Sequence, residues 1–242
     1  SLGTRSSTTT DMVVHFLKES DLVLGIGCSF TRIHYGMNLL NSKAIIHITN
    51  SSDDLNKDYS PDHAVIGDAK RGDVGHSAQM YAKAVFESLG CDAITVSPYL
   101  GQDALKPFFE YTDRGIFILC LTSNQGAHDF QLPDLYLNVA KKAQQWNVSG
   151  NIGLVVGATF PEKIKAIRKN TSQMPFLIPG VGTQGGDLER TLLYADSVSK
   201  LPYLINASRS IIYASSKEDY AQQARIAAKK LRDKINSLRS SL

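Results

Sequence analysis

Long hydrophobic runs are absent from this sequence. No apolar stretch approaches the roughly 20 residues that a membrane-spanning helix requires, and no signal peptide is visible. The net charge is only +3, which is too small to indicate a surface for nucleic acid or for a membrane. We therefore expect neither a nucleic acid nor a membrane as a partner.

Cysteine is also scarce. The three cysteines, Cys28, Cys91 and Cys120, form no C-x-x-C pair and no zinc-type spacing with histidine. An odd number of cysteines argues against a disulfide framework and fits a reducing compartment. We therefore expect a cytoplasmic protein that holds no structural metal.

Short apolar runs alternate with helical patterns along the whole chain, which is typical of a parallel sheet covered by helices. The runs that predict strands are 21–27, 44–49, 63–68, 93–97, 116–121, 151–157, 175–180 and 202–206. The clearest helical patterns cover 8–20, 76–90, 134–146, 161–169 and 216–238. Eight strands in a chain of this length predict an α/β fold of the (β/α)8 TIM-barrel type, and an open doubly wound sheet is the alternative.

The stretch VIGDAKRGD at 65–73 places charged residues where the third strand should end. Asp68 and Lys70 are two residues apart, so on an extended strand they point to the same side. In either candidate fold, functional groups gather at the carboxyl ends of the strands. The alternative interpretation is a solvated turn with a salt bridge.

Small polar residues follow the next two strands. Ser97 follows the fourth strand, and Thr122 and Ser123 follow the fifth. Hydroxyl groups at these positions suit a ligand with amide-like edges. Ordinary turn chemistry explains each loop equally well when that loop is considered alone.

The last two strands end in loops that suit an anion. Glycine-rich loops let backbone N–H groups approach an anion closely, and a guanidinium adds a fork of donors. After the seventh strand the glycines are Gly180, Gly182, Gly185 and Gly186, and after the eighth come Ser208 and Arg209. Barrels often bind phosphate with these two loops, so we expect a phosphorylated metabolite as the substrate. The triphosphate-binding G-K-[ST] motif is missing.

Several long motifs resemble the orotidine 5'-phosphate decarboxylase family in its longer bacterial type. They are DAKRGDVGHSAQMYA, TVSPYLGQDALKPF, DRGIFILCLTSN, GNIGLVVGAT, MPFLIPGVGTQGGD and INASRSIIYAS, from about residue 65 to the C-terminus. The resemblance implies a homodimeric (β/α)8 barrel without a cofactor or metal. It also implies decarboxylation of orotidine monophosphate (OMP) to UMP, the last step of de novo pyrimidine synthesis.

The resemblance also implies roles for individual residues. Asp68, Lys70 and Asp73 match the D-x-K-x-x-D signature: Asp68 crowds the substrate carboxylate, Lys70 protonates C6, and Asp73 reaches the partner subunit's site. Ser123 contacts the pyrimidine edge, and Gln184 and Arg209 hold the phosphate. The full set of expected substrate-binding residues is Ser97, Thr122, Ser123, Gly182, Gln184, Gly185, Ser208 and Arg209.

The first 65 residues do not show the family's pattern. The family's first two strands end in an aspartate and a lysine, whereas here Ser29, Thr49 and Asn50 stand at those ends. Residues 8–68 instead resemble the central domain of thiamine-diphosphate enzymes of the acetolactate synthase type, a Rossmann-like sheet that holds no thiamine. We therefore expect one (β/α)8 domain over 1–242, in which a Rossmann-like segment, 1–65, replaces the first barrel units of a decarboxylase-like segment, 66–242.

The missing second-strand lysine has a consequence for activity. That lysine contributes a charge that positions Asp68 and Lys70, so its loss predicts strongly reduced catalysis. The alternative hypothesis is a catalytically inactive structural chimera. An active thiamine enzyme is not expected, because both thiamine-binding domains are missing.

Overall fold

The computed structural model describes residues 22–26, 44–48, 65–171, 174–181, 186–196 and 203–241. The chain divides into two compact units. The described residues of the first unit are 22–26, 44–48, 65–69 and 75–94. The second unit contains 70–74 and the described residues from 95 onward.

The described residues form eight strands in two sheets. Strands β1 and β2 make a two-stranded sheet, and the other six lie in the order β3-β4-β5-β6-β7-β8. The bounds are β1 (Leu22–Ile26), β2 (Ala44–Ile48), β3 (Ile66–Arg71), β4 (Ala93–Val96), β5 (Gly115–Leu121), β6 (Ile152–Val156), β7 (Phe176–Pro179) and β8 (Tyr203–Asn206). The pairs β1–β2, β5–β6, β6–β7 and β7–β8 are parallel. The larger sheet follows chain order without the reversal that a doubly wound sheet requires.

The strands of the second unit are apolar on both faces, as a parallel sheet covered by helices requires. All five residues of β6 are buried, and its Gly153 accommodates a close neighbour. A Cβ atom on Gly153 would lie 2.7 Å from the Phe117 ring and 2.8 Å from the Pro175 carbonyl oxygen. The larger fully buried side chains of this core include Leu105, Phe108, Ile116, Ile118, Leu121, Ile152, Leu154, Ile164, Ile167 and Phe176.

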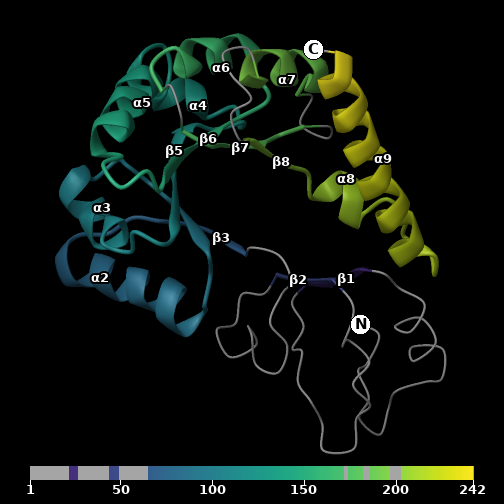
Figure 1. Cartoon of the computed structure of the whole chain (residues 1–242), viewed down its shortest axis with the longest axis horizontal. Coiled ribbons are helices and arrows are strands. Elements are labelled where there is room, and N and C mark those ends of the chain that lie inside the picture. The colour runs from purple at the N-terminus through teal and green to yellow at the C-terminus, as the bar shows by residue number, and fades with distance from the viewer. Residues whose placement is uncertain are drawn as a thin grey trace, which may run out of the picture. The chain divides into compact units, whose positions relative to one another are not determined.

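Helices follow most of the strands (Figure 1). Their bounds are α2 (Gly75–Lys83), the π-helix η2 (Ala84–Ser88), α3 (Gln102–Phe109), α4 (Ala127–Phe130), α5 (Leu135–Trp146), α6 (Pro161–Arg168), α7 (Leu188–Asp196), α8 (Arg209–Ile212) and α9 (Tyr220–Ser241). Within the second unit α5 contacts β5 and β6, α6 contacts α7, and α9 contacts α7 and α8. None of the helices in the described part of the chain is long and apolar enough to cross a membrane.

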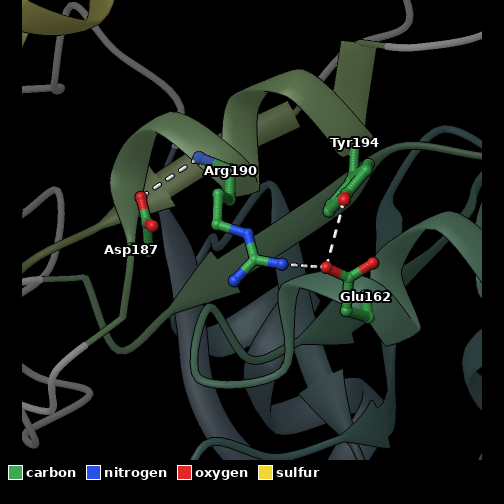
Figure 2. Close-up of polar contacts among 4 residues, drawn as sticks. All are labelled: Glu162, Asp187, Arg190 and Tyr194. Carbon is green, nitrogen blue, oxygen red and sulfur yellow. Dashed lines mark hydrogen bonds and ion pairs between the residues drawn. The ribbon is translucent and has the colours of Figure 1, made fainter.

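Helices α6 and α7 are joined at their first turns (Figure 2). Pro161 starts α6, because its fixed φ and missing N–H suit the first helical position. Glu162 accepts hydrogen bonds from the Arg190 guanidinium and from the Tyr194 hydroxyl. Asp187 accepts the Arg190 backbone N–H at 3.1 Å at the start of α7. The contacts of Glu162 tie the first turn of α6 to α7.

The sequence predicts the strands more accurately than their ends. All eight expected strands are present, and the α/β class with a parallel sheet is confirmed. The third strand, expected at 63–68, instead runs from Ile66 to Arg71. The helix expected at 76–90 changes to a π-helix at Ala84. The helix expected at 8–20 lies outside the described residues.

Candidate functional site

Asp68 and Lys70 lie within β3 rather than after it, because the strand continues to Arg71. Both side chains are exposed and Ala69 between them is half-buried, which agrees with the expected alternation along a strand. Lys70 has a φ of 47°, a left-handed conformation that non-glycine residues rarely adopt. Such a conformation persists only where the surroundings hold it in place.

Neighbouring groups on β4 hold the backbone of this stretch. The hydroxyl of Thr95, which is fully buried, accepts the Lys70 backbone N–H at 3.0 Å. The backbone N–H of Ser97 donates to the Arg71 carbonyl at 2.7 Å. Ser97 is therefore close to the candidate lysine, as expected for a residue after the neighbouring strand. Asp73 is half-buried, and its Oδ1 accepts the Val74 backbone N–H at 2.8 Å.

Thr122 and Ser123 follow β5 directly and are both half-buried. Thr122 is bonded within the protein: its hydroxyl donates to Asn124 Oδ1 at 2.6 Å and accepts from Gln131 Nε2 at 2.9 Å. Its backbone N–H donates to Gln131 Oε1 at 2.7 Å. Thr122 is therefore bonded to Gln131 at the end of the loop that follows β5.

The loop after β7 begins and ends in close contact with β6. Gly180 has a φ of 94° and accepts the Gly186 backbone N–H at 3.1 Å. A Cβ atom on Gly186 would lie 2.6 Å from the Gly180 oxygen and 2.7 Å from the Ala158 Cβ, so only glycine fits there. Gly182, Gln184 and Gly185, which were expected to bind the substrate, lie outside the described residues.

The loop after β8 carries the last two expected residues. Ser208 precedes α8, and its hydroxyl donates to Asn206 Oδ1 at 3.3 Å. Arg209 is the first residue of α8 and is exposed. Because β7 and β8 are parallel neighbours, the loop after β8 leaves the same edge of the sheet as the start of the glycine loop at Gly180.

An open hollow of about 540 Å³ lies against the loop after β5. It is lined by Gln125, Gly126, His128 and Asp129, none of which the sequence analysis selected. The His128 ring packs on Phe160 with ring centres 5.7 Å apart. These residues belong to the segment between Ser123 and Gln131.

The cysteines of the described residues are structural. Cys91 and Cys120 form no disulfide and are only 2% exposed. Burial raises the pKa of the Cys120 thiol, so this thiol stays protonated and unreactive. In the part of the chain that the structure describes, no three His, Cys, Asp or Glu side chains are arranged to hold a metal ion.

Four residues around the expected site were not selected from the sequence. They are Thr95, Gln131, Gly157 and Thr159. Gly157 in VVGAT was the one residue of the four that the sequence could have indicated, because a glycine at the end of a buried strand often marks the close approach of another backbone. No local sequence pattern identifies Gln131, because its hydrogen-bond partner, Thr122, lies nine residues earlier in the chain.

Comparison with known proteins gives consistent matches. The model of the orotidine 5'-phosphate decarboxylase / HUMPS family matches residues 11–224. An orotidine 5'-phosphate decarboxylase of Dehalococcoides mccartyi is 53% identical over 188 residues, covering 74% of this chain and 70% of the relative. The solved OMP decarboxylase of Leishmania donovani matches with a TM-score of 0.63 and 41% identity, covering 73% of this chain and 68% of that one.

A more distant structure extends the similarity in fold. The decarboxylase of Methanocaldococcus jannaschii, solved with the inhibitor BMP, covers 88% of this chain and 78% of its own length. Its TM-score is 0.55 and its identity is 20%, so it supports the fold alone.

The comparisons correct the interpretation of the N-terminal segment. The family model starts at residue 11, so excluding the first 65 residues from the family was wrong for 11–64. The comparisons give no support for a thiamine-enzyme domain at 8–68 or for a chimera. The physical reason is that buried parallel strands of unrelated α/β families share one apolar pattern, so DLVLGIG does not distinguish them. Ser29, Thr49 and Asn50 lie outside the described residues.

Proposed function

Because the chain belongs to the orotidine 5'-phosphate decarboxylase / HUMPS family, we propose that it converts OMP to UMP by releasing CO2. The observation that carries this proposal is the 53% identity to the Dehalococcoides mccartyi decarboxylase. The proposed reaction uses the charges of protein side chains alone, without a cofactor.

In this reaction the bond between C6 of the pyrimidine and the carboxylate carbon breaks. CO2 leaves, the electron pair remains on C6, and Lys70 donates a proton to that carbon. Repulsion between Asp68 and the substrate carboxylate is relieved as CO2 leaves, and the Lys70 ammonium faces the growing negative charge. Both effects favour the transition state over the ground state. The exposure of both side chains on β3 supports their contact with a ligand.

The remaining site residues are proposed to bind the two ends of the substrate. Ser97, Thr122 and Ser123 serve the pyrimidine end. The residues proposed for the phosphate end are Gly182, Gln184, Gly185, Ser208 and Arg209. The adjacent exits of β7 and β8 support this division, because two neighbouring loops can hold one phosphate group.

We also propose a single closed (β/α)8 domain that forms a homodimer in the cytoplasm. Members of this family are TIM barrels, and the described residues show part of that fold. The eight strands and the chain-order neighbours in the larger sheet support closure. The buried free thiols of Cys91 and Cys120 fit a reducing compartment.

The test is a decarboxylation assay with OMP, combined with calorimetric titration of UMP. We expect UMP to bind and OMP to be consumed with release of one CO2 per UMP formed. A side-by-side assay with the Dehalococcoides mccartyi enzyme checks the reduced rate that the missing second-strand lysine predicts. Binding of UMP without any turnover would favour a catalytically inactive family member, and absence of both would overturn the proposal.

Mixing two inactive variants tests the shared site. If Asp73 reaches the site of the partner subunit, subunits carrying Lys70→Ala and subunits carrying Asp73→Ala form heterodimers with one intact site out of two. After complete subunit exchange we expect about a quarter of the wild-type activity, measured in the OMP assay. A mixture that stays as inactive as either variant would show that Asp73 acts within its own subunit.

A further inference from the structure

The loop that carries Ser123 is closed by the side chain of Gln131. This residue follows the short helix α4 and its backbone N–H donates to the Ala127 carbonyl at 2.9 Å. Its amide then reaches back to the end of β5, where it accepts the Thr122 N–H at 2.7 Å and donates to the Thr122 hydroxyl at 2.9 Å. One side chain therefore bonds both the backbone N–H and the hydroxyl of the residue before Ser123.

The other side of Ser123 is held by the end of β6. The Thr159 hydroxyl donates to the Ser123 carbonyl oxygen at 3.2 Å. Gly157 lies so close that a Cβ atom there would be 2.8 Å from the Cα and N atoms of Ser123. The Gly157 backbone N–H donates to the Leu121 carbonyl at 2.7 Å. The two residues before Ser123 and its own carbonyl are thus bonded to groups from Gln131 and the β6 end.

The start of α6, which follows Thr159 in the chain, is bonded to α7. Thr159 stands two residues before the start of α6, and Glu162 in the first turn of α6 is bonded to Arg190 of α7 (Figure 2). Gln131 and Thr159 therefore bond the chain at Thr122 and at Ser123 itself, which favours a role in placing Ser123.

We infer that Gln131 and Thr159 are positioning residues that orient the Ser123 hydroxyl toward the pyrimidine end of the substrate. This inference rests on the proposed function. Neither side chain needs to touch the substrate: Gln131 acts through the N–H and hydroxyl of Thr122, and Thr159 acts through the Ser123 carbonyl. Holding a binding group in its productive orientation before the substrate arrives avoids the entropy loss of ordering it afterwards, and it depends on supporting hydrogen bonds of this kind.

A double-mutant cycle in the full-length protein tests the inference. The variants are Gln131→Met, Thr159→Val and Ser123→Ala, alone and combined, with kcat and KM for OMP measured for each. We expect Gln131→Met and Thr159→Val each to lower kcat/KM by roughly tenfold to a hundredfold. In the Ser123→Ala background, the same two changes should cause less than about a twofold further loss, since groups that act as a unit are not additive.

Matched controls separate positioning from general stability. Gln144→Met removes a glutamine from α5 whose Oε1 has no hydrogen-bond partner among the described residues. Thr171→Val removes a buried hydroxyl that donates to the Ile167 carbonyl at 2.9 Å, away from Ser123. Both should leave kcat/KM unchanged at temperatures well below the unfolding midpoint. If Gln131→Met does not fold, Gln131→Glu keeps the acceptor for the Thr122 N–H, loses the donor to its hydroxyl, and should show an intermediate loss.

The outcomes distinguish this inference from the proposed function. Suppose that the wild-type protein turns over OMP and that the losses in kcat/KM from Gln131→Met and Ser123→Ala multiply in the double variant. That result would overturn the inference but not the proposed function. Unchanged kcat/KM in both Gln131→Met and Thr159→Val would overturn it as well. A wild-type protein that neither binds UMP nor consumes OMP would overturn the proposed function, and the inference with it.

Discussion

Replacing Lys70 with alanine is expected to lower the rate of OMP decarboxylation by roughly four to six orders of magnitude, as removal of a central catalytic group does in other enzymes. In the proposed reaction Lys70 supplies both the positive charge opposite the developing carbanion and the proton that C6 receives, so the substitution removes both at once. UMP should still bind, because the phosphate end does not involve this side chain. Single-turnover decarboxylation and UMP titration measure the two effects.

The left-handed backbone of Lys70 separates loss of chemistry from loss of fold. With a φ of 47°, alanine at this position retains the strain, whereas glycine relieves it. Lys70→Gly should therefore be more stable than Lys70→Ala by about 1 kcal/mol, while both are equally inactive. Urea unfolding of the two variants measures the difference. Lys141→Ala on the exposed face of α5 is the matched lysine control and should keep wild-type activity.

Two results would contradict this prediction. Turnover by Lys70→Ala within tenfold of the wild type would exclude Lys70 as the proton donor. Equal stability of the alanine and glycine variants would show that the Thr95 hydroxyl, which accepts the Lys70 N–H, does not hold this residue in a strained conformation.

Replacing Gly157 with alanine is expected to have the second largest effect. The new Cβ would lie 2.8 Å from two backbone atoms of Ser123 and 2.9 Å from its Cβ, and backbone cannot yield as a flexible side chain can. Ser123 must therefore move. We expect kcat/KM for OMP to fall by about a hundredfold, the effect of a displacement near 1 Å, with a stability loss of roughly 1–3 kcal/mol.

Gly153→Ala is the matched control on the same strand. Its Cβ would meet the Phe117 ring at 2.7 Å and the Pro175 carbonyl oxygen at 2.8 Å, so the steric conflict is similar but lies inside β6, away from Ser123. This variant should lose a comparable roughly 1–3 kcal/mol of stability and retain its kcat/KM at low temperature. If both variants lose the same activity, the effect of Gly157→Ala comes from destabilisation and not from the position of Ser123.

The sequence predicted the strands well because burial on both faces demands continuous apolar runs. Runs such as NIGLVVG and IFILCL have this pattern, and both are strands. Strand ends were less certain. The polar residues of DAKR suggested that β3 stops at Asp68, whereas backbone contacts with β4 carry it to Arg71. Hydrogen bonds between strands, which the local sequence does not reveal, decide such boundaries.

The same limit explains the error at the N-terminus. Apolar strand patterns are shared by many α/β families, so the sequence of residues 8–68 suggested another enzyme class. The family model, which weighs positions along the whole length, includes that segment. Motifs with special chemistry, such as D-x-K-x-x-D, identified the family correctly because few other folds require those charges at that spacing.

The sequence by itself determined the α/β class and the family, and it selected the candidate residues at the strand ends, since these depend on residue type and on spacing along one strand. Only the tertiary structure decided which residues support them. Thr95 bonds Lys70, Gln131 bonds Thr122, and Gly157 and Thr159 contact Ser123. The hydrogen bonds at Lys70, Thr122 and Ser123 join residues that lie 25, 9 and 36 positions apart in the chain, respectively. Hydrogen bonds and steric contacts over such separations exist only after the strands have aligned, because alignment sets the distances between their ends.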